Sequence, residues 1–275
     1  MSHDRSVDAA PWKSLFLSHL EKQGASPEFY LATVNHESQP RLRACIHRGF
    51  WAGLPENSHN QMPKNPKVYD TDCPAFTTDA RMGKVFDIFA TGKGRGTLEQ
   101  SRAGTGGGGP VEALYWIKDV KVQWRLRGRC WIIAADDLEH EGEGDMQNSG
   151  TVTMKAVLQR YMRKTGQAGD WSWKREVENF FGNLSPVMRG SFKNPPPGQP
   201  VQEGSGPGEK LGQVANLLQE DDLARRNFRV AVITPEEVEH LDLTELENQQ
   251  RRIWRLVGDG QDEGISEWEE IVTWP

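Results

Sequence analysis

The spacing of hydrophobic positions changes several times along this chain, and each change predicts an element. Between Pro11 and Gly24 the large apolar residues recur at helical spacing, so residues 11–23 predict an amphipathic helix. Residues 29–34 (FYLATV) and 41–51 (RLRACIHRGFW) have the composition of strands and are separated by the turn-rich NHESQP. These two segments predict an antiparallel hairpin.

Residues 75–90 (AFTTDARMGKVFDIFA) predict the end of a strand followed by a helix. Thr78 or Asp79 is the expected N-cap, because a short polar side chain accepts hydrogen bonds from first-turn amides. Lys84 then lies in or near the first turns. The apolar residues that follow it are expected to form the buried stripe of this helix. These are Val85, Phe86, Ile88 and Phe89.

The segment 112–136 predicts two further strands, since apolar and polar residues alternate in its second half. Val122, Trp124 and Leu126 form the packed face there, and the residues between them form the polar face. Residues 152–165 and 172–184 predict helices. Two more strands are predicted near the C-terminus, FRVAVITP and RRIWRLV, which an acidic connection joins into a terminal hairpin, and WEEIVTWP closes the chain.

This order of elements has no alternation of strand and helix, which excludes a parallel sheet of the βαβ kind. The expected fold is therefore mainly β, an antiparallel barrel with flanking helices. We expect a single domain over residues 1–275. Its long loops fall near 51–70, 91–110, 136–150 and 192–212, where Gly, Pro and polar residues leave little to bury.

Composition and charge exclude several classes of function. The formal charge of -6 and the 36% hydrophobic residues are typical of a mildly acidic soluble protein and argue against a general nucleic-acid binder. No apolar leader and no long apolar run is present, so we expect a cytoplasmic protein without a membrane span. Three cysteines without CxxC spacing, and histidines without paired helical spacing, predict no metal site.

The segment TTDARMGK has the residue types that a phosphate group requires. Thr77 and Thr78 offer hydroxyl groups, the following helix offers amides, and Arg81 and Lys84 offer positive charge. A capped surface helix with basic residues downstream is the alternative interpretation.

Arg43 and Arg48 lie on one predicted strand, where alternation places them on opposite faces unless the strand bends near Gly49. A solvated edge strand is the alternative. Gln123 is a neutral amide between Val122 and Trp124, and it can both donate to and accept from the edge of a heterocycle. A cross-strand hydrogen bond is the alternative for Gln123.

The order of these motifs resembles a known family. RxRxxxxRGF, FTTDxRxxK, QxRxxG, LSPxxRxSFxxPPPG and a final RRxW are similar to the pyridoxamine 5′-phosphate oxidase-like split-barrel flavoproteins, and more narrowly to their Alr-type FMN-binding subfamily. The resemblance runs from about Trp12 to Pro275. It implies an antiparallel split β-barrel that binds FMN in a cleft at a homodimer interface.

The resemblance also implies roles for individual residues. Arg81 and Lys84 correspond to the phosphate clamp, Gln123 to a glutamine near the isoalloxazine ring, and Arg252 to an arginine contributed across the dimer. Arg189 and Ser191 fall in the segment that closes the site. The full set of implied FMN-binding residues is Arg43, Arg48, Thr77, Thr78, Arg81, Lys84, Gln123, Arg189, Ser191 and Arg252.

The chain departs from the family at two places. Met82 stands where a serine is usual, and LENQQRR stands where the vitamer oxidases have an Arg-Leu-His segment that binds substrate. The expected function is an FMN-binding flavoprotein, an oxidoreductase of the pyridoxamine/pyridoxine 5′-phosphate oxidase-like type with a small-molecule substrate. The alternatives are a non-catalytic FMN-binding or flavin-storage protein, or a chain that has lost FMN. No catalytic residue is evident. Trp124 and Trp254 are the tryptophans best placed to stack on a flavin.

Overall fold

The computed structural model describes residues 9–24, 26–92, 104–138, 149–206, 208, 210–215, 222–257 and 267–275. Most of this part of the chain is antiparallel β-sheet. Six strands form a closed barrel, in which each strand pairs with two neighbours and the last pairs again with the first. In order around the barrel these are β8 (Phe228–Asp242), β4 (Pro74–Asp79), β2 (Pro40–Phe50), β1 (Glu28–Val34), β5 (Gly106–Ile117) and β6 (Val122–Ile133).

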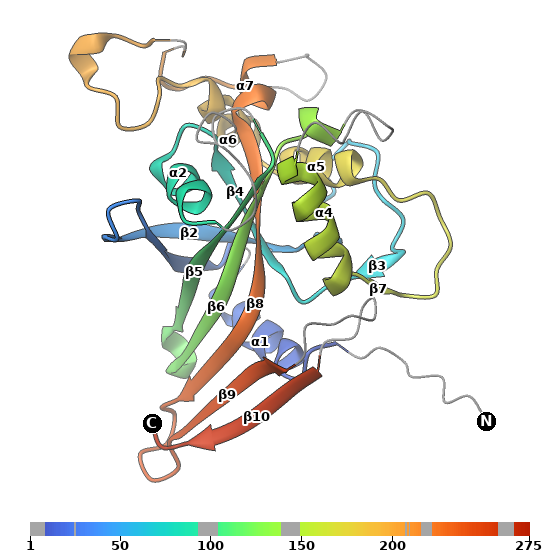
Figure 1. The fold of residues 1–275 in the computed structure, drawn as a ribbon, viewed down its shortest axis with the longest axis vertical. Helices are drawn as coiled ribbons and strands as arrows, with labels where there is room; N and C mark the ends of the chain where they lie inside the picture. Colours follow the sequence, from blue (N-terminus) through green and yellow to red (C-terminus); the bar gives the residue numbers. More distant parts are fainter. Residues whose placement is uncertain are drawn as a thin grey trace.

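The longest strand, β8, belongs to the barrel at one end and to a sheet extension at the other. Its first residues pair with β4, and its last residues pair with β9 (Gln250–Val257), which pairs in turn with β10 (Glu267–Thr273). Figure 1 shows the β9–β10 hairpin at the opposite end of the molecule from α6 and α7. The predicted barrel is confirmed. The predicted terminal hairpin is only partly correct, because β9 pairs with residues 237–242, which were expected to be a connection, while FRVAVITP pairs with β4 and β6.

Helices surround this sheet. Figure 1 shows α4 and α5 together on one flank of the barrel, with α2 on another. In chain order the α-helices are α1 (Lys13–Leu20), α2 (Gly83–Ala90), α4 (Ser149–Tyr161), α5 (Trp173–Gly182), α6 (Pro186–Gly190) and α7 (Asp222–Asn227). The 3-10 turns are Glu21–Gln23, Lys118–Val120, Asp136–Leu138, Ser191–Lys193 and Val201–Glu203, and β3 (Tyr69–Asp70) pairs with β7 (Arg163–Lys164). Within the described residues, no helix has both the length and the apolar character needed to cross a membrane.

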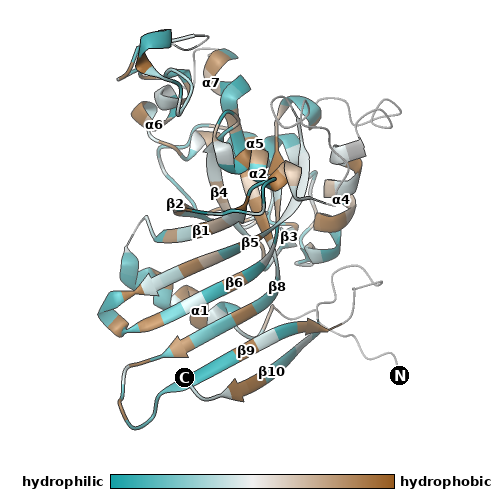
Figure 2. Cartoon of the chain, turned by 60° about the vertical axis from the view of Figure 1, so that its left-hand side comes forward, coloured by the Kyte–Doolittle hydropathy of each residue, from teal (hydrophilic) through white to brown (hydrophobic). Residues whose placement is uncertain are grey.

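The hydrophobic core has two parts. Inside the barrel, Phe16 of α1 makes edge contacts with Tyr115 at 5.0 Å and with Trp124 at 5.3 Å between ring centroids. Outside the barrel, Trp51 packs against Trp173 of α5 and is fully buried. Figure 2 shows polar and apolar residues alternating along parts of β5 and β6, which is the pattern that separates the inner face from the outer face.

Two boundaries differ from the predictions. Asp79 is the last residue of β4 and its carboxylate accepts from the Arg81 amide at 2.8 Å, so neither Thr78 nor Asp79 caps a helix. The chain first turns, and α2 begins at Gly83 after Met82, which makes no side-chain cap. The loop predicted over 91–110 is also too long, because β5 begins at Gly106 and its glycines pair with β6. Residues 93–103 and 139–148 of the predicted loops lie outside the described residues, and the single domain stays a prediction.

Candidate functional site

A buried lysine marks the start of α2. Lys84 is only 9% exposed, and its Nζ lies 3.2 Å from Thr78 Oγ1 and 2.8 Å from Met82 Sδ. Among the described residues, no carboxylate forms an ion pair with it. Burial lowers the pKa of the Lys84 ammonium, as expected for a charged group removed from water. A buried cation without a charged partner is unfavourable, and an anion beside it would offset that penalty.

Arg43 lies near Lys84 and forms hydrogen bonds with side chains of both β1 and α2. Its guanidinium donates to Thr33 Oγ1 of β1 at 2.7 Å and to Asp87 Oδ2 of α2 at 3.3 Å. The Thr33 hydroxyl donates to the same carboxylate at 2.6 Å. Burial raises the pKa of the nearby Cys45 thiol, and the positive charges of Lys84 and Arg43 partly offset this rise. Arg43, Lys84 and Cys45 therefore share one electropositive environment.

These residues fit a phosphate group. Helix α2 has no side-chain cap at its N-terminus, so its first-turn amides are not satisfied by a capping side chain. Lys84 adds a positive charge at that helix end, and Thr78 adds a hydroxyl group. The Asp87 carboxylate neutralises Arg43 but not Lys84. We call Arg43, Thr78 and Lys84 with the α2 N-terminus the α2 cluster.

Arg81 and Thr77 are not part of the α2 cluster in this chain. The Arg81 guanidinium forms a two-point ion pair with Asp79 and donates to the carbonyl groups of Phe192 and Asn194. This side chain ties β4 to the segment after α6. Thr77 is adjacent to Thr78 on β4 and therefore faces the other side of that strand.

Arg48 lies on the opposite face of β2 from Arg43. Strand β2 has an irregularity between His47 and Gly49, as would be required for Arg43 and Arg48 to reach one ligand. The Arg48 guanidinium nevertheless points to α6, where it lies 3.6 Å from Met188 Sδ. Its Nε is buried without a hydrogen-bond partner, and burial lowers the pKa of the guanidinium. Arg48 and His47 line a cavity of about 790 Å³ between α1, the end of β2 and the segment after it. This cavity was not foreseen from the sequence.

Gln123 and Arg252 lie on opposite faces of the extended sheet. Gln123 is paired across the strands with Trp116 and Leu241 on the outer face. Arg252 is paired with His240, whose ring contacts the buried Trp124, so Arg252 belongs to the other face. Arg252 is half exposed and lies 3.9 Å from Glu270. A single chain does not bring this pair together.

Arg189 and Ser191 hold the segment around α6. The buried Arg189 guanidinium donates to the carbonyl groups of Ala215, Gly182 and Leu184. The Ser191 hydroxyl donates to the Met188 carbonyl at 2.7 Å. In this chain both residues stabilise local backbone structure.

The two tryptophans singled out for flavin stacking instead pack against each other. Trp124 and Trp254 are buried, with their rings stacked at a centroid distance of 5.9 Å. Thr33 and Asp87, in contrast, contact Arg43 in the structure but were not predicted from the sequence as site residues. Asp87 lies three residues after Lys84, a helical spacing that places both on one face and could have indicated it.

Comparison with known proteins points to one family. Residues 9–134 match the family model described as "Pyridoxamine 5'-phosphate oxidase, FMN-binding domain". A pyridoxamine 5'-phosphate oxidase-related, FMN binding protein from Nostoc punctiforme has the same fold, with 20% sequence identity over 98% of this chain and 100% of that chain and a TM-score of 0.54. No curated protein matches this sequence.

More distant structural similarity is also present. PhzG from Burkholderia lata, in complex with tetrahydrophenazine-1-carboxylic acid, is 10% identical over 96% of this chain and 88% of that chain, with a TM-score of 0.39. General Stress Protein 26 from Bacillus anthracis is 9% identical over 84% of this chain and 94% of that chain, with a TM-score of 0.31.

Proposed function

We propose that this chain, which through residues 9–134 belongs to the pyridoxamine 5'-phosphate oxidase FMN-binding domain family, is an FMN-binding flavoprotein. One observation carries the proposal: among the described residues no carboxylate forms an ion pair with the buried Lys84, which lies at the uncapped start of α2. The phosphate of FMN is an anion of the right kind for this position. The Alr-type subfamily stays a prediction.

The residues of the α2 cluster have separate tasks in this proposal. Lys84 and the first-turn amides hold the phosphate, and the Thr78 hydroxyl donates to it. Asp87 and Thr33 fix the guanidinium of Arg43, so that little side-chain freedom is lost when the ligand binds. Bound FMN would supply two-electron redox chemistry, while the protein orients it.

A second copy of the chain completes the site in this proposal. The outer face of β1, β2 and β5 exposes large apolar side chains, namely Tyr30 (45%), Leu42 (69%) and Trp116 (39%). Strand pairing places Tyr30 and Leu42 on the same side of the sheet, and Gln123 lies opposite Trp116. Such a face is favourable to bury in a homodimer. We assign to the partner copy the flavin contact of Arg252, so that Gln123 and Arg252 at one site come from different chains.

The reaction we favour is oxidation of a pyridoxamine or pyridoxine 5′-phosphate type substrate. LENQQRR, which has no His and no Arg upstream of its final arginine pair, favours the second candidate, a non-catalytic FMN-binding or flavin-storage protein. A cytoplasmic location suits the three free cysteines, since a reducing compartment keeps thiols unpaired.

Two measurements test this proposal. Titration with FMN and with riboflavin, followed by flavin fluorescence, should show much tighter binding of FMN, because only FMN has the phosphate. Equal affinity for both would contradict the phosphate position at α2. Pyridoxal 5′-phosphate formation by the FMN-loaded protein then separates the two functions, since sustained turnover excludes pure storage.

A further inference from the structure

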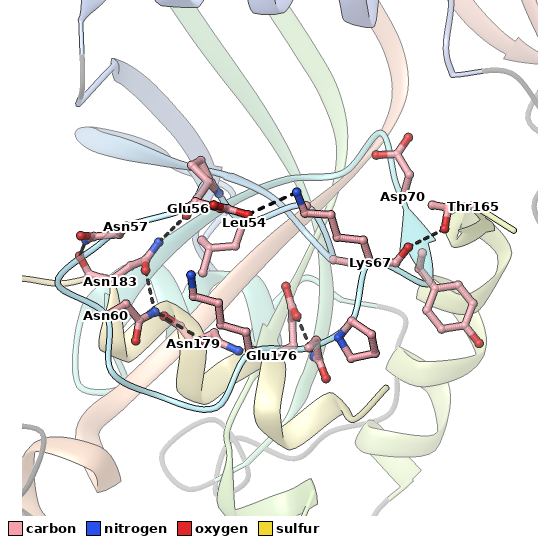
Figure 3. Close-up of a pocket in the computed structure, with 17 residues that line it drawn as sticks. Leu54, Glu56, Asn57, Asn60, Lys67, Asp70, Thr165, Glu176, Asn179 and Asn183 are labelled. Carbon is pink, nitrogen blue, oxygen red and sulfur yellow. Dashed lines mark hydrogen bonds and ion pairs between the residues drawn. The ribbon is translucent and has the colours of Figure 1, made fainter. Parts of the chain in front are cut away.

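A second cavity, of about 480 Å³, lies between the segment 52–70 and helix α5. Figure 3 shows Asn60, Asn179 and Asn183 together at one end of it, with Lys67, Asp70 and Thr165 at the other. None of the residues that line it belongs to the α2 cluster. Its volume is in the range of small-molecule sites.

Asparagine side chains build the walls of this cavity. Asn60 Nδ2 donates to the Asn179 carbonyl at 3.1 Å and to Asn183 Oδ1 at 2.6 Å, and Asn183 Nδ2 donates to the Pro55 carbonyl at 3.0 Å. Asn179 Nδ2 donates to the Pro63 carbonyl. The amides thus use their hydrogen-bonding capacity to fix segment 52–70 against α5. The cavity is preformed, and these amides are not free to recognise a sugar.

A carboxyl group lies in the wall of this cavity, and no cation of the described residues forms an ion pair with it. Glu176 of α5 is only 4% exposed, and its Oε2 accepts from Asn65 Nδ2 at 2.8 Å. A second hydrogen bond comes from the backbone of Ala52. A carboxylate has about four acceptor positions, so roughly two remain for a ligand. Burial raises the pKa of Glu176, and a cation beside it would offset this effect.

Two lysines also line the cavity, and they differ in their partners. Lys67 forms an ion pair with Glu56 at 3.4 Å, whereas Lys64 has no ion pair or hydrogen bond from its side chain within the described residues. The cavity therefore combines one carboxyl group without a cation and one ammonium group without an anion. A phosphate dianion would be repelled by Glu176. Within the described residues no cluster of ligands for a metal ion exists.

We propose that this cavity binds a small zwitterion of the amino-acid or dipeptide class. The ligand's ammonium group pairs with Glu176 and its carboxylate pairs with Lys64. Both pairs are charge-assisted, and the one at Glu176 is shielded from water, where such hydrogen bonds are strongest. This proposal and the FMN proposal rest on different residues, so either can fail while the other stands.

Three related compounds test the charge pattern by isothermal titration calorimetry on the full-length protein. Alanyl-alanine has both charges, its N-acetyl derivative lacks the ammonium group, and its C-terminal amide lacks the carboxylate. We expect alanyl-alanine to bind most tightly, the amide to bind more weakly, and the N-acetyl derivative to bind least. Absence of saturable binding of alanyl-alanine, or equal binding of all three, would overturn the proposal.

Variants assign each end of the ligand. Glu176→Gln should weaken alanyl-alanine binding by about tenfold or more, because a charged hydrogen bond is replaced by a neutral one. Lys64→Met should weaken it less and remove the preference for alanyl-alanine over its amide. Lys22→Met is the control, since the exposed Lys22 does not line this cavity, and it should bind like the unmodified protein. If Glu176→Gln fails to fold, the Lys64→Met variant still tests the proposal, because Lys64 is exposed. An unchanged preference of Lys64→Met for alanyl-alanine over its amide would refute the proposal.

Discussion

At the scale of single residues, the described part of the chain satisfies its buried cations in different ways. Arg163 pairs with both Asp70 and Asp72. Arg189 donates to backbone carbonyl groups. Lys84 has only a hydroxyl group and a thioether within reach. Because desolvation of a charge is costly unless a partner repays it, Lys84 is the residue whose position is best explained by a ligand.

The first prediction concerns that lysine. Lys84→Met should weaken FMN binding by roughly ten- to a hundredfold, because it removes one charged hydrogen bond to the phosphate. Riboflavin binding should stay nearly unchanged. The same substitution removes an unpaired buried charge, so the unfolding free energy of the FMN-free protein should rise by about 1 kcal/mol. Fluorescence titration and urea unfolding measure the two effects. Lys67→Met serves as control, and a parallel loss of FMN and riboflavin binding would contradict the assignment.

The second prediction concerns pH. Burial lowers the pKa of His47 to about 3 from 6.5, and its Nδ1 lies 3.2 Å from the Tyr115 hydroxyl. The unfolded chain therefore binds a proton below pH 6.5 that the folded protein does not accept until about pH 3. Stability should be complete above this window and fall by about 3 to 5 kcal/mol as the pH falls through it.

His47→Phe separates this effect from the other histidines. The substitution should reduce the slope of unfolding free energy against pH, although it also removes the hydrogen bond to Tyr115. His240, whose pKa burial lowers to about 4, leaves part of the slope in place. Urea unfolding at a series of pH values gives both slopes, and identical slopes would exclude His47 as a source.

At the scale of elements, β6 and β8 show what hydrophobic alternation predicts. Val122, Trp124 and Leu126 are buried as predicted from their spacing. Strand β8 was predicted to end at Pro235 because acidic residues follow, yet it continues to Asp242. Its Glu237 and Glu239 are balanced by arginines of β6, at 3.1 Å for the pair Arg127–Glu237 and 3.6 Å for Arg125–Glu239. Neutralisation by a neighbouring strand cannot be predicted from local composition.

The same limit applies to the candidate site. Thr78 and Lys84 could be predicted because one short motif contains them both. Thr33 and Asp87 reach Arg43 only through the pairing of β1 with β2 and the phase of α2. Arg81 was assigned to the phosphate from its position in the motif, but Asp79, two residues earlier, holds its guanidinium. A motif predicts which residue types are present, whereas the register decides which of them meet.

The third prediction concerns the close approach of β6 and β8 at Gly128. The register of this pairing shifts between Arg127 and Gly128, and a Cβ atom at Gly128 would lie 2.0 Å from the Thr234 carbonyl oxygen. Gly128→Ala should therefore destabilise the protein by about 2 to 4 kcal/mol, as measured by urea unfolding. Gly83→Ala is the control. No atom lies within 4 Å of a Cβ there, and alanine favours helix, so that variant should be neutral or slightly stabilising.

At the scale of the whole molecule, the separation of the candidate residues is itself informative. Lys84 lies at the start of α2 and Arg252 on the β9 extension, with no interaction between them within the described chain. The exposed apolar face formed by Tyr30, Leu42 and Trp116 offers a surface on which a second copy can pack. If two copies associate there, each FMN site takes Lys84 from one chain and Arg252 from the other.

The fourth prediction follows from this shared site. Lys84→Met and Arg252→Gln homodimers should each bind FMN weakly, at both of their sites. When the two variants are unfolded, mixed and refolded together, each mixed dimer contains one site with both native residues and one site with neither. Random assortment then restores tight binding at roughly a quarter of all sites. If Lys84 and Arg252 served the same site from one chain, mixing would restore nothing, so the restored fraction in an FMN titration decides whether the dimer builds the site.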